Sequence, residues 1–324
     1  MDYVKLGRTG LKVSTYCVGG DNFGDQTPEA ESLLLLGRAF EAGVNFVDTA
    51  NSYCGGKSEE IISKFIAGRR SQVVLATKCR SKVGTGPNDI GVSRKAVMQA
   101  CEDSLRRLNT EYIDLYYVHS YDPDTPLDET LRAFDDLVHQ GKVRYTGCSN
   151  FNGWQITKAL WISDKQNLAR FDALQPRYNL LYRDPEREAF PAAREHGVGI
   201  VAYSPMAGGF LLGKYSKEQV PSGSRFSEQF RAHQFYRRTY WNDVAFEASE
   251  KFGAVAKKHG VSRQSLALTW VRSQPGITAC IVGAKDQKQM KENLAAWEEK
   301  VTAEAVNEAT VVGDWLRQNG PWVG

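Results

Sequence analysis

The feature that most constrains the fold is a regular alternation of short apolar runs and longer amphipathic segments. The runs are rich in β-branched residues, as strands are, and lie at residues 14–20, 45–50, 72–78, 112–119, 143–150, 171–179, 199–205 and 279–284. Between them, segments such as SLLLLGRAFEAG and RKAVMQACEDSLRRL carry apolar residues at helical spacing. Strands that alternate with helices predict an α/β fold with a parallel sheet.

Eight such strand–helix units with no Pro/Gly/Ser linker between them favour one closed (β/α)8 TIM barrel over two domains. We therefore expect a single domain over residues 1–324. The opening YVKLGRTGLKVS predicts a two-stranded β-hairpin ahead of the barrel, turning at Thr9-Gly10. Two additions stand outside the repeat: an aromatic and basic connection at residues 206–241, and an extra C-terminal helix or tail after Val301.

Composition excludes several classes of function. The net charge is only +3, and the basic residues are scattered, which argues against nucleic acid. No apolar stretch reaches the ~18 residues of a membrane span, and the N-terminus lacks a secretion signal. The six cysteines show neither CxxC nor Cys/His ligand spacing, so we expect reduced thiols, no metal site and a cytoplasmic protein.

Polar residues follow or close the predicted strands. Because an α/β barrel builds its active site at the carboxyl ends of its strands, these residues are expected at one rim. They are Asp48, Lys78, His119, Ser149, Asn150, Gln175, Tyr203, Ser204 and Lys285. The sequence therefore predicts a polar site at that end of the barrel.

Four of the side chains suggest proton transfer. If Lys78 lies against the phenol of Tyr53, its ammonium stabilises the tyrosinate, and we expect the pKa of Tyr53 to fall. Asp48 would hold Lys78 charged, and His119 would polarise the same substrate oxygen. No serine–base pair, metal ligand set or paired carboxylates accompany them, so the missing electron donor implies a hydride cofactor.

Each of these residues also has an ordinary structural interpretation. A strand-end aspartate is commonly a turn former or helix cap, a lone histidine a core or rim residue, and a lone lysine a solvated strand end. The functional interpretation depends on their appearance together, on consecutive strands at one predicted face.

Several motifs carry a family resemblance. In order along the chain, DTANSYCGGKSEE, ATK, YYVHSYD, GKVRYTGCSNF, YSPMAGGFLLGKY and IVGAKDQKQMKEN resemble signatures of the aldo-keto reductase superfamily. The likeness is greatest to its bacterial branches and the related potassium-channel β subunits. It implies a (β/α)8 barrel that reduces carbonyls with NADPH. It also implies a catalytic tetrad of Asp48, Tyr53, Lys78 and His119, with Tyr53 as the acid.

The resemblance also implies a cofactor site. Tyr203 would stack on the nicotinamide, which Asp48 would adjoin, and Ser149, Asn150 and Gln175 would hold its carboxamide. Ser204, Pro205, Met206, Gly208, Lys214 and Arg225 would follow the pyrophosphate. Gly283, Lys285, Gln289, Glu292 and Asn293 would bind the adenosine and its 2′-phosphate. Because Lys285 stands where arginine is usual and Asp286 follows it, we expect NADP(H) preference with NAD(H) possible.

Three features leave alternatives open. Cys54 replaces a usual glycine, so it is either a tolerated small residue in altered backbone or an oxidation-sensitive thiol. The aromatics of residues 206–241, with Trp315 and Trp322, would partly be core and partly shape the substrate pocket. Arg231, Arg237 and Arg238 would be a solvated face or meet a substrate anion.

The leading hypothesis is reversible reduction of a small aldehyde or ketone to an alcohol. A cofactor-binding regulatory subunit with little turnover is the first alternative, and a lyase with Lys78 as a Schiff-base amine is the second. The sequence leaves the natural substrate, the physiological direction and the oligomeric state open.

Overall fold

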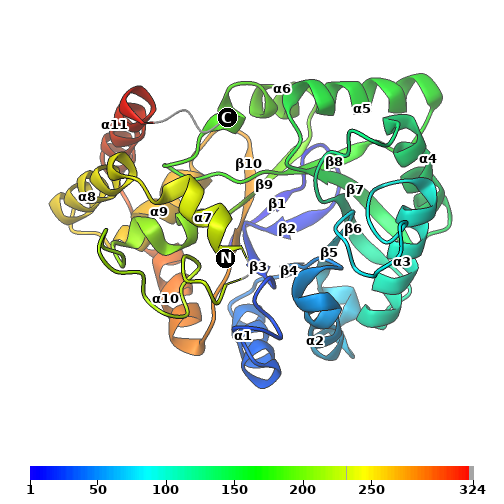
Figure 1. The fold of residues 1–324 in the computed structure, drawn as a ribbon, viewed down its shortest axis with the longest axis horizontal. Helices are drawn as coiled ribbons and strands as arrows, with labels where there is room; N and C mark the ends of the chain where they lie inside the picture. The colour runs from blue at the N-terminus through cyan, green and yellow to red at the C-terminus, as the bar shows by residue number, and fades with distance from the viewer. Residues whose placement is uncertain (231, 321–324) are drawn as a thin grey trace. The chain divides into compact units, whose positions relative to one another are not determined.

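The computed structural model describes residues 1–230 and 232–320, so Arg231 and Trp322 lie outside the described residues. Ten strands are present in this part of the chain: β1 (Tyr3–Lys5), β2 (Lys12–Ser14), β3 (Tyr16–Gly19), β4 (Phe46–Asp48), β5 (Val74–Cys79), β6 (Ile113–Val118), β7 (Val143–Ser149), β8 (Phe171–Gln175), β9 (Gly199–Tyr203) and β10 (Ile277–Val282). Strands β3 to β10 form a closed barrel of parallel strands in sequence order (Figure 1). The predicted (β/α)8 barrel is confirmed.

Helices fill the connections. The α-helices are α1 (Glu29–Glu41), α2 (Lys57–Ile66), α3 (Arg94–Leu108), α4 (Leu127–His139), α5 (Gly153–Gln166), α6 (Ala189–Glu195), α7 (His233–Tyr240), α8 (Asp243–Lys258), α9 (Arg263–Arg272), α10 (Gln287–Glu298) and α11 (Ala303–Asn319). Short 3-10 helices are η1 (Tyr53–Gly56), η2 (Arg70–Gln72), η3 (Asp184–Glu186) and η4 (Ala207–Leu212). The extra C-terminal segment is thus a helix. Among the described residues, no helix combines the length and apolar character of a membrane span.

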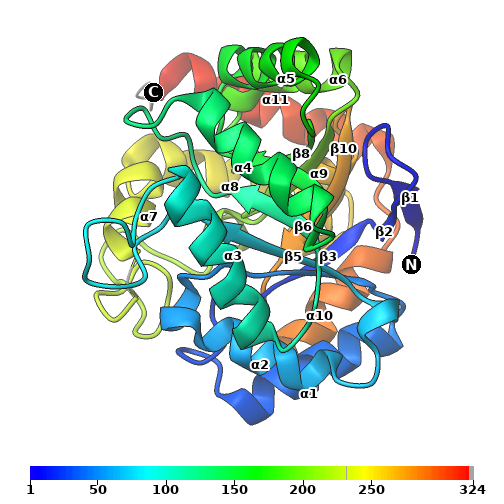
Figure 2. The same cartoon turned by 90° about the vertical axis from the view of Figure 1, so that its right-hand side faces the viewer.

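The chain divides into two compact units. The first contains residues 1–176, 185–201 and 276–291, and the second contains residues 177–184, 202–275 and 292–324. In the first unit, successive helices α1 to α6 pack side by side outside the ring of strands (Figures 1 and 2). The second unit contains α7, α8, α9 and α11, and α11 packs on both α8 and α9. One domain over residues 1–324 stays a prediction.

The N-terminal hairpin covers the amino end of the barrel, opposite to the expected site. Strands β1 and β2 pair antiparallel, as predicted, and the connecting turn runs from Leu6 to Leu11. A side chain on Gly7 would place its Cβ 2.5 Å from the Gly197 carbonyl oxygen, and the φ of Gly7 is +54°. Glycine is therefore required where the hairpin meets the start of β9.

The additional segments bury most of their aromatic residues. Phe226, Phe230, Tyr236 and Tyr240 are buried, whereas Phe235 is 45 % exposed. Phe226 and Tyr240 pack on Phe210 with centroids 5.6 and 6.2 Å away, whereas Phe230 and Phe235 pack on Tyr236. Most aromatics of residues 206–241 are therefore buried, and which of them shape the substrate pocket stays a prediction.

Candidate active site

Two charged residues face each other at the carboxyl ends of neighbouring strands in the first unit. Asp48 is the last residue of β4, and Lys78 is the second-last residue of β5. Asp48 pairs in register with Ala76, two residues before Lys78, so both side chains lie at the same rim. Asp48 is 2 % exposed and Lys78 is 0 % exposed. Charges this deeply buried require partners.

Lys78 has a partner for each proton of its ammonium group. Its Nζ lies 2.5 Å from Asp48 Oδ1, 2.7 Å from the Thr49 carbonyl oxygen and 3.3 Å from the Tyr53 hydroxyl. An ammonium group has three donors, so these contacts satisfy it completely. The structure thus brings the aspartate, lysine and tyrosine of the predicted tetrad together.

The second oxygen of the Asp48 carboxylate is also bound. Gln175, the last residue of β8, donates from Nε2 to Asp48 Oδ2 at 2.7 Å. Ser149 Oγ donates to the Gln175 carbonyl oxygen at 2.7 Å, and Asn150 Nδ2 lies 3.0 Å from Ser149 Oγ. Gln175, Ser149 and Asn150 therefore adjoin the tetrad, but in this structure the Gln175 amide orients Asp48.

Tyr53 begins a tight turn whose next three residues are left-handed. The φ angles are 51° at Cys54, 65° at Gly55 and 93° at Gly56. A cysteine in this region costs about 1–2 kcal/mol relative to the right-handed region. The position of Cys54 does need positive φ, and its Sγ contacts the Asp21 carbonyl oxygen at 3.5 Å.

His119 directly follows β6 and faces Tyr53. The two rings meet edge to face with centroids 5.7 Å apart. His119 Nδ1 lies 3.4 Å from Ser81 Oγ, and Asn150 Nδ2 donates to the His119 carbonyl oxygen at 3.1 Å. All four residues of the predicted tetrad therefore lie in one cluster.

Burial changes the acidity expected of this cluster. Burial lowers the pKa of the Lys78 ammonium, but Asp48 and Tyr53 raise it by more, so the pKa lies above 10.5. Burial raises the pKa of Tyr53 above 10.0, although Lys78 lowers it in part. The predicted net fall in the pKa of Tyr53 is therefore wrong. Lys78 acts in the expected direction, but desolvation outweighs it.

Comparison with known proteins agrees with this geometry. The model of the aldo/keto reductase family matches residues 16–313. The chain belongs to the aldo/keto reductase family. Membership of this family supports an oxidoreductase function for the chain, and members of the family generally bind nicotinamide cofactors.

Relatives of this aldo/keto reductase carry several names. The chain is 39 % identical over 309 residues to the uncharacterized oxidoreductase YrpG of Bacillus subtilis, covering 92 % of this chain and 91 % of the relative. It is 37 % identical over 302 residues to a probable voltage-gated potassium channel subunit beta of Arabidopsis thaliana, covering 91 % of each. It is 33 % identical over 327 residues to the aldo-keto reductase dtxS3 of Metarhizium robertsii, covering 91 % and 86 %.

The second unit of this aldo/keto reductase carries features that fit a phosphate-bearing cofactor. Ser204 follows β9, and its buried Oγ has no hydrogen-bond partner within residues 1–230 and 232–320. Gly208 and Gly209 have φ angles of 67° and 88°, a left-handed backbone that favours glycine, and the Tyr236 ring packs where a Cβ on Gly208 would lie. Arg225 Cδ lies 3.5 Å from where a Cβ on Gly208 would be. An orphan hydroxyl, a glycine turn and a guanidinium suit an anion.

The other predicted pyrophosphate and nicotinamide residues of the second unit differ in their exposure. Tyr203 ends β9 and is partly exposed, Pro205 is buried, Met206 is partly exposed and Lys214 is exposed. Their cofactor contacts stay predictions.

The predicted adenosine residues lie around the start of α10. Gly283 follows β10, and Lys285 is exposed. Gln289 Oε1 accepts from the Lys285 backbone N–H at 3.2 Å, and Asp286 Oδ1 accepts from the Gln289 N–H at 2.8 Å. Asp286 therefore caps α10, so its carboxylate is already engaged.

Glu292 and Asn293 of the second unit differ in exposure. Glu292 is exposed, whereas Asn293 is 3 % exposed and its Oδ1 accepts from Gln264 Nε2. Within the described residues, no group of three or more His, Cys, Asp or Glu side chains is placed to hold a metal ion.

Three polar residues of the first unit escaped sequence reasoning. Ser81 contacts His119, and the backbone oxygen of Thr49 contacts Lys78. Glu59 is completely buried beneath the site. A carboxylate six residues after Tyr53, within SEE, was the available signal, but a glutamate beside a second glutamate resembles a solvated residue.

Proposed function

We propose that this aldo/keto reductase reversibly reduces an aldehyde or ketone to an alcohol with NADP(H), using Tyr53 as general acid and base. The observation that carries the proposal is the contact of one buried ammonium, Lys78 Nζ, with both the Asp48 carboxylate and the Tyr53 hydroxyl. This arrangement places a proton donor beside a fixed positive charge.

The geometry supports the proton transfer that the reaction needs. Because the pKa of Tyr53 lies above 10.0, the phenol is protonated at neutral pH and can donate to a carbonyl oxygen. The tyrosinate left behind accepts from Lys78, whose own pKa lies above 10.5, so the ammonium charge persists. Asp48 and the Thr49 carbonyl hold that ammonium in place.

His119 would orient the substrate oxygen. In the tautomer that accepts from Ser81 Oγ at Nδ1, the imidazole carries a proton on Nε2 and can donate to the carbonyl oxygen. The nicotinamide, when bound, supplies or accepts the hydride. Ser149 and Asn150 would bind its carboxamide, Ser204, Gly208 and Arg225 its pyrophosphate, and Lys285 its 2′-phosphate.

A screen of the purified protein tests the proposal. Aldehydes, ketones, sugars and secondary alcohols are offered with NADPH, NADH and their oxidised forms, and absorbance at the nicotinamide band is followed. We expect turnover of at least one carbonyl with loss of NADPH. A protein that binds NADPH but turns over no member of the panel would contradict the assignment.

We expect NADP(H) to be preferred over NAD(H) in kcat/KM, because exposed Lys285 offers a cation while Asp286 is occupied as a helix cap. Lys285→Arg should increase the preference, since a guanidinium binds phosphate with two parallel bonds. Lys158→Arg, an exposed change on α5, serves as the control. A preference for NAD(H) of more than about tenfold, about 1.4 kcal/mol, would overturn the cofactor assignment.

A regulatory subunit is the alternative function, and one observation favours it: relatives at 35–37 % identity are named potassium channel β subunits. An intact tetrad does not distinguish the two. Turnover does, because a subunit that only senses its cofactor would show binding without loss of NADPH in the presence of carbonyls.

A Schiff-base lyase is disfavoured. The raised pKa of Lys78 keeps its amine protonated, and a protonated amine has no lone pair for attack. All three of its donors are also engaged. We further propose a cytoplasmic, single-domain protein that acts on a small molecule.

A further inference from the structure

We propose that the buried Arg107–Glu59 ion pair is a positioning device that holds the Tyr53 hydroxyl at Lys78. The inference rests on the proposed role of Tyr53 as proton donor. Neither residue touches the reacting groups, so both act through the elements that carry them.

Glu59 joins the two elements that bear the catalytic pair. It lies on α2, directly after the turn that begins with Tyr53, and is 0 % exposed. Its Oε1 accepts from Thr77 Oγ1 at 2.6 Å, and Thr77 precedes Lys78 on β5. One carboxylate oxygen therefore ties the helix behind Tyr53 to the strand that carries Lys78.

Arg107 completes the connection from α3. Its Nε donates to Glu59 Oε2 at 2.7 Å, and its side chain is 19 % exposed. Glu59 has no other basic partner among the described residues. With Thr77 on Oε1 and Arg107 on Oε2, both oxygens of the buried carboxylate are engaged, and loss of Arg107 would leave Glu59 without its cation, a strongly unfavourable change.

The stem of Arg107 also supports the turn itself. A Cβ on Gly56 would lie 2.8 Å from Arg107 Cδ, so the arginine chain packs directly on the turn. The backbone there is left-handed from Cys54 to Gly56, a conformation that the surroundings must maintain. The same side chain therefore braces the turn after Tyr53 and fixes the helix that follows.

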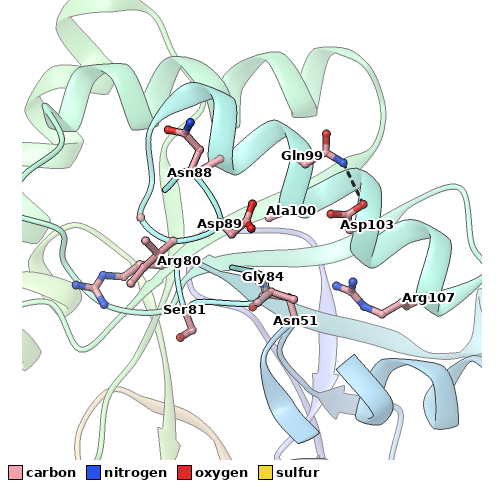
Figure 3. Close-up of a pocket in the computed structure, with 14 residues that line it drawn as sticks. Asn51, Arg80, Ser81, Gly84, Asn88, Asp89, Gln99, Ala100, Asp103 and Arg107 are labelled. Carbon is pink, nitrogen blue, oxygen red and sulfur yellow. Dashed lines mark hydrogen bonds between the residues drawn. The ribbon is translucent and has the colours of Figure 1, made fainter. Parts of the chain in front are cut away.

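A cavity on the outer side of Arg107 makes this role testable. It has a volume of about 260 Å³ and is lined by Asn51, the loop from Arg80 to Gly91 and one face of α3. Figure 3 shows Arg107 reaching from α3 toward Asn51 and Gly84 at its wall. Truncating Arg107 would extend this open space to Glu59, so a small added cation can take the place of the lost guanidinium.

The test compares Arg107→Ala with Arg106→Ala in the full chain. Arg106 is the neighbouring arginine on α3, is 70 % exposed and binds Asp103. We expect kcat of Arg107→Ala to fall on the order of 10- to 100-fold, the loss typical of a misplaced reacting group, with cofactor affinity retained. Methylguanidinium below denaturing concentration should restore kcat of this variant alone. No response to methylguanidinium would contradict the proposal.

A double variant separates positioning from folding. In Glu59→Gln/Arg107→Met no buried charge is left unpaired, so stability should return toward wild type while kcat stays low. If kcat returned together with stability, the ion pair would serve folding only, and the proposal would be wrong.

A spectroscopic measurement keeps the inference independent of turnover. The ¹³Cζ signal of Tyr53, assigned by its absence in Tyr53→Phe, should shift in Arg107→Ala and stay in place in Arg106→Ala. If wild type reduces no carbonyl, the proposed function fails while this signal still decides the positioning role. An unchanged Tyr53 signal in folded Arg107→Ala would overturn it.

Discussion

Replacing Tyr53 by phenylalanine is expected to lower kcat for carbonyl reduction by about 10²- to 10⁴-fold, the contribution typical of a positioned general acid. The variant loses the hydroxyl that Lys78 contacts and keeps the aromatic ring that packs against His119. Lys78 retains Asp48 and the Thr49 carbonyl, so the fold should lose only about 1 kcal/mol. Steady-state kinetics and thermal unfolding measure the two effects.

Binding of the nicotinamide should stay nearly unchanged in this variant, which fluorescence titration of NADPH can establish. Tyr3→Phe is a matched control, because it removes a hydroxyl that donates to the Gly43 carbonyl at 2.6 Å in the hairpin at the other end of the barrel. Tyr3→Phe should keep wild-type kcat. Retained kcat in Tyr53→Phe would mean that another group supplies the proton.

The common location of three residues of the predicted tetrad could be predicted from topology, whereas Tyr53 was expected there from the family resemblance. Parallel strands in sequence order bring Asp48, Lys78 and His119 to one rim whatever packs around them. The acidity of Tyr53 could not be predicted in the same way. Its sign depends on how deeply the phenol is buried, which is set by side chains distant in sequence, and burial outweighs Lys78.

The predicted strand boundaries were wrong where a local feature ends the hydrogen bonding between neighbouring strands. The run at 171–179 stops at Gln175, because Pro176 has no N–H to donate to a neighbouring strand. The run at 14–20 divides into β2 and β3 around Thr15, whose N–H bonds to the Asp2 carbonyl instead of a barrel strand. In both cases residues typical of strands lie on either side of the interruption, so the sequence pattern alone does not show where the strand ends.

The ion pair of Glu59 and Arg107 could not be predicted from the sequence, because the carboxylate within SEE is only a weak signal. Glu59 and Arg107 lie 48 residues apart on two helices. Glu59 precedes Ile62 and Ile66 by three and seven residues, the spacing of the buried face of α2, but charged residues are mostly exposed. Only the packing of α2 on α3 turns them into a buried pair. Ion pairs between helices therefore become visible only in the three-dimensional structure, whereas residues at strand ends can be predicted from the sequence.

Replacing Lys78 by methionine is expected to have the largest effect on stability. Asp48, 2 % exposed, would then keep Gln175 as its partner but lose its countercharge, a change that typically costs about 3–5 kcal/mol. The tyrosinate would also lose its stabilising cation, so kcat should fall by about 10²- to 10³-fold. Chemical unfolding at constant pH and reductase kinetics measure the two losses.

The pH dependence of this loss identifies its cause. Burial already raises the pKa of Asp48 above 3.8, and removal of Lys78 takes away the largest influence that lowers it. A carboxyl whose folded pKa is raised favours the folded state below its unfolded pKa, and this contribution disappears as pH rises through the folded pKa. The destabilisation of Lys78→Met should therefore be smaller in acid than at neutral pH. Asp48→Asn/Lys78→Met should recover stability without recovering kcat.

Lys64→Met provides the contrast, since Lys64 pairs with Glu29 at 2.5 Å but is 52 % exposed. Solvent screens such a pair, so its loss should change stability little and kcat not at all. If Lys78→Met were as stable as Lys64→Met at neutral pH, Asp48 would have to be solvated or protonated in the native protein. The ammonium could then not be the charge that supports Tyr53, and the mechanism built on it would fail with it.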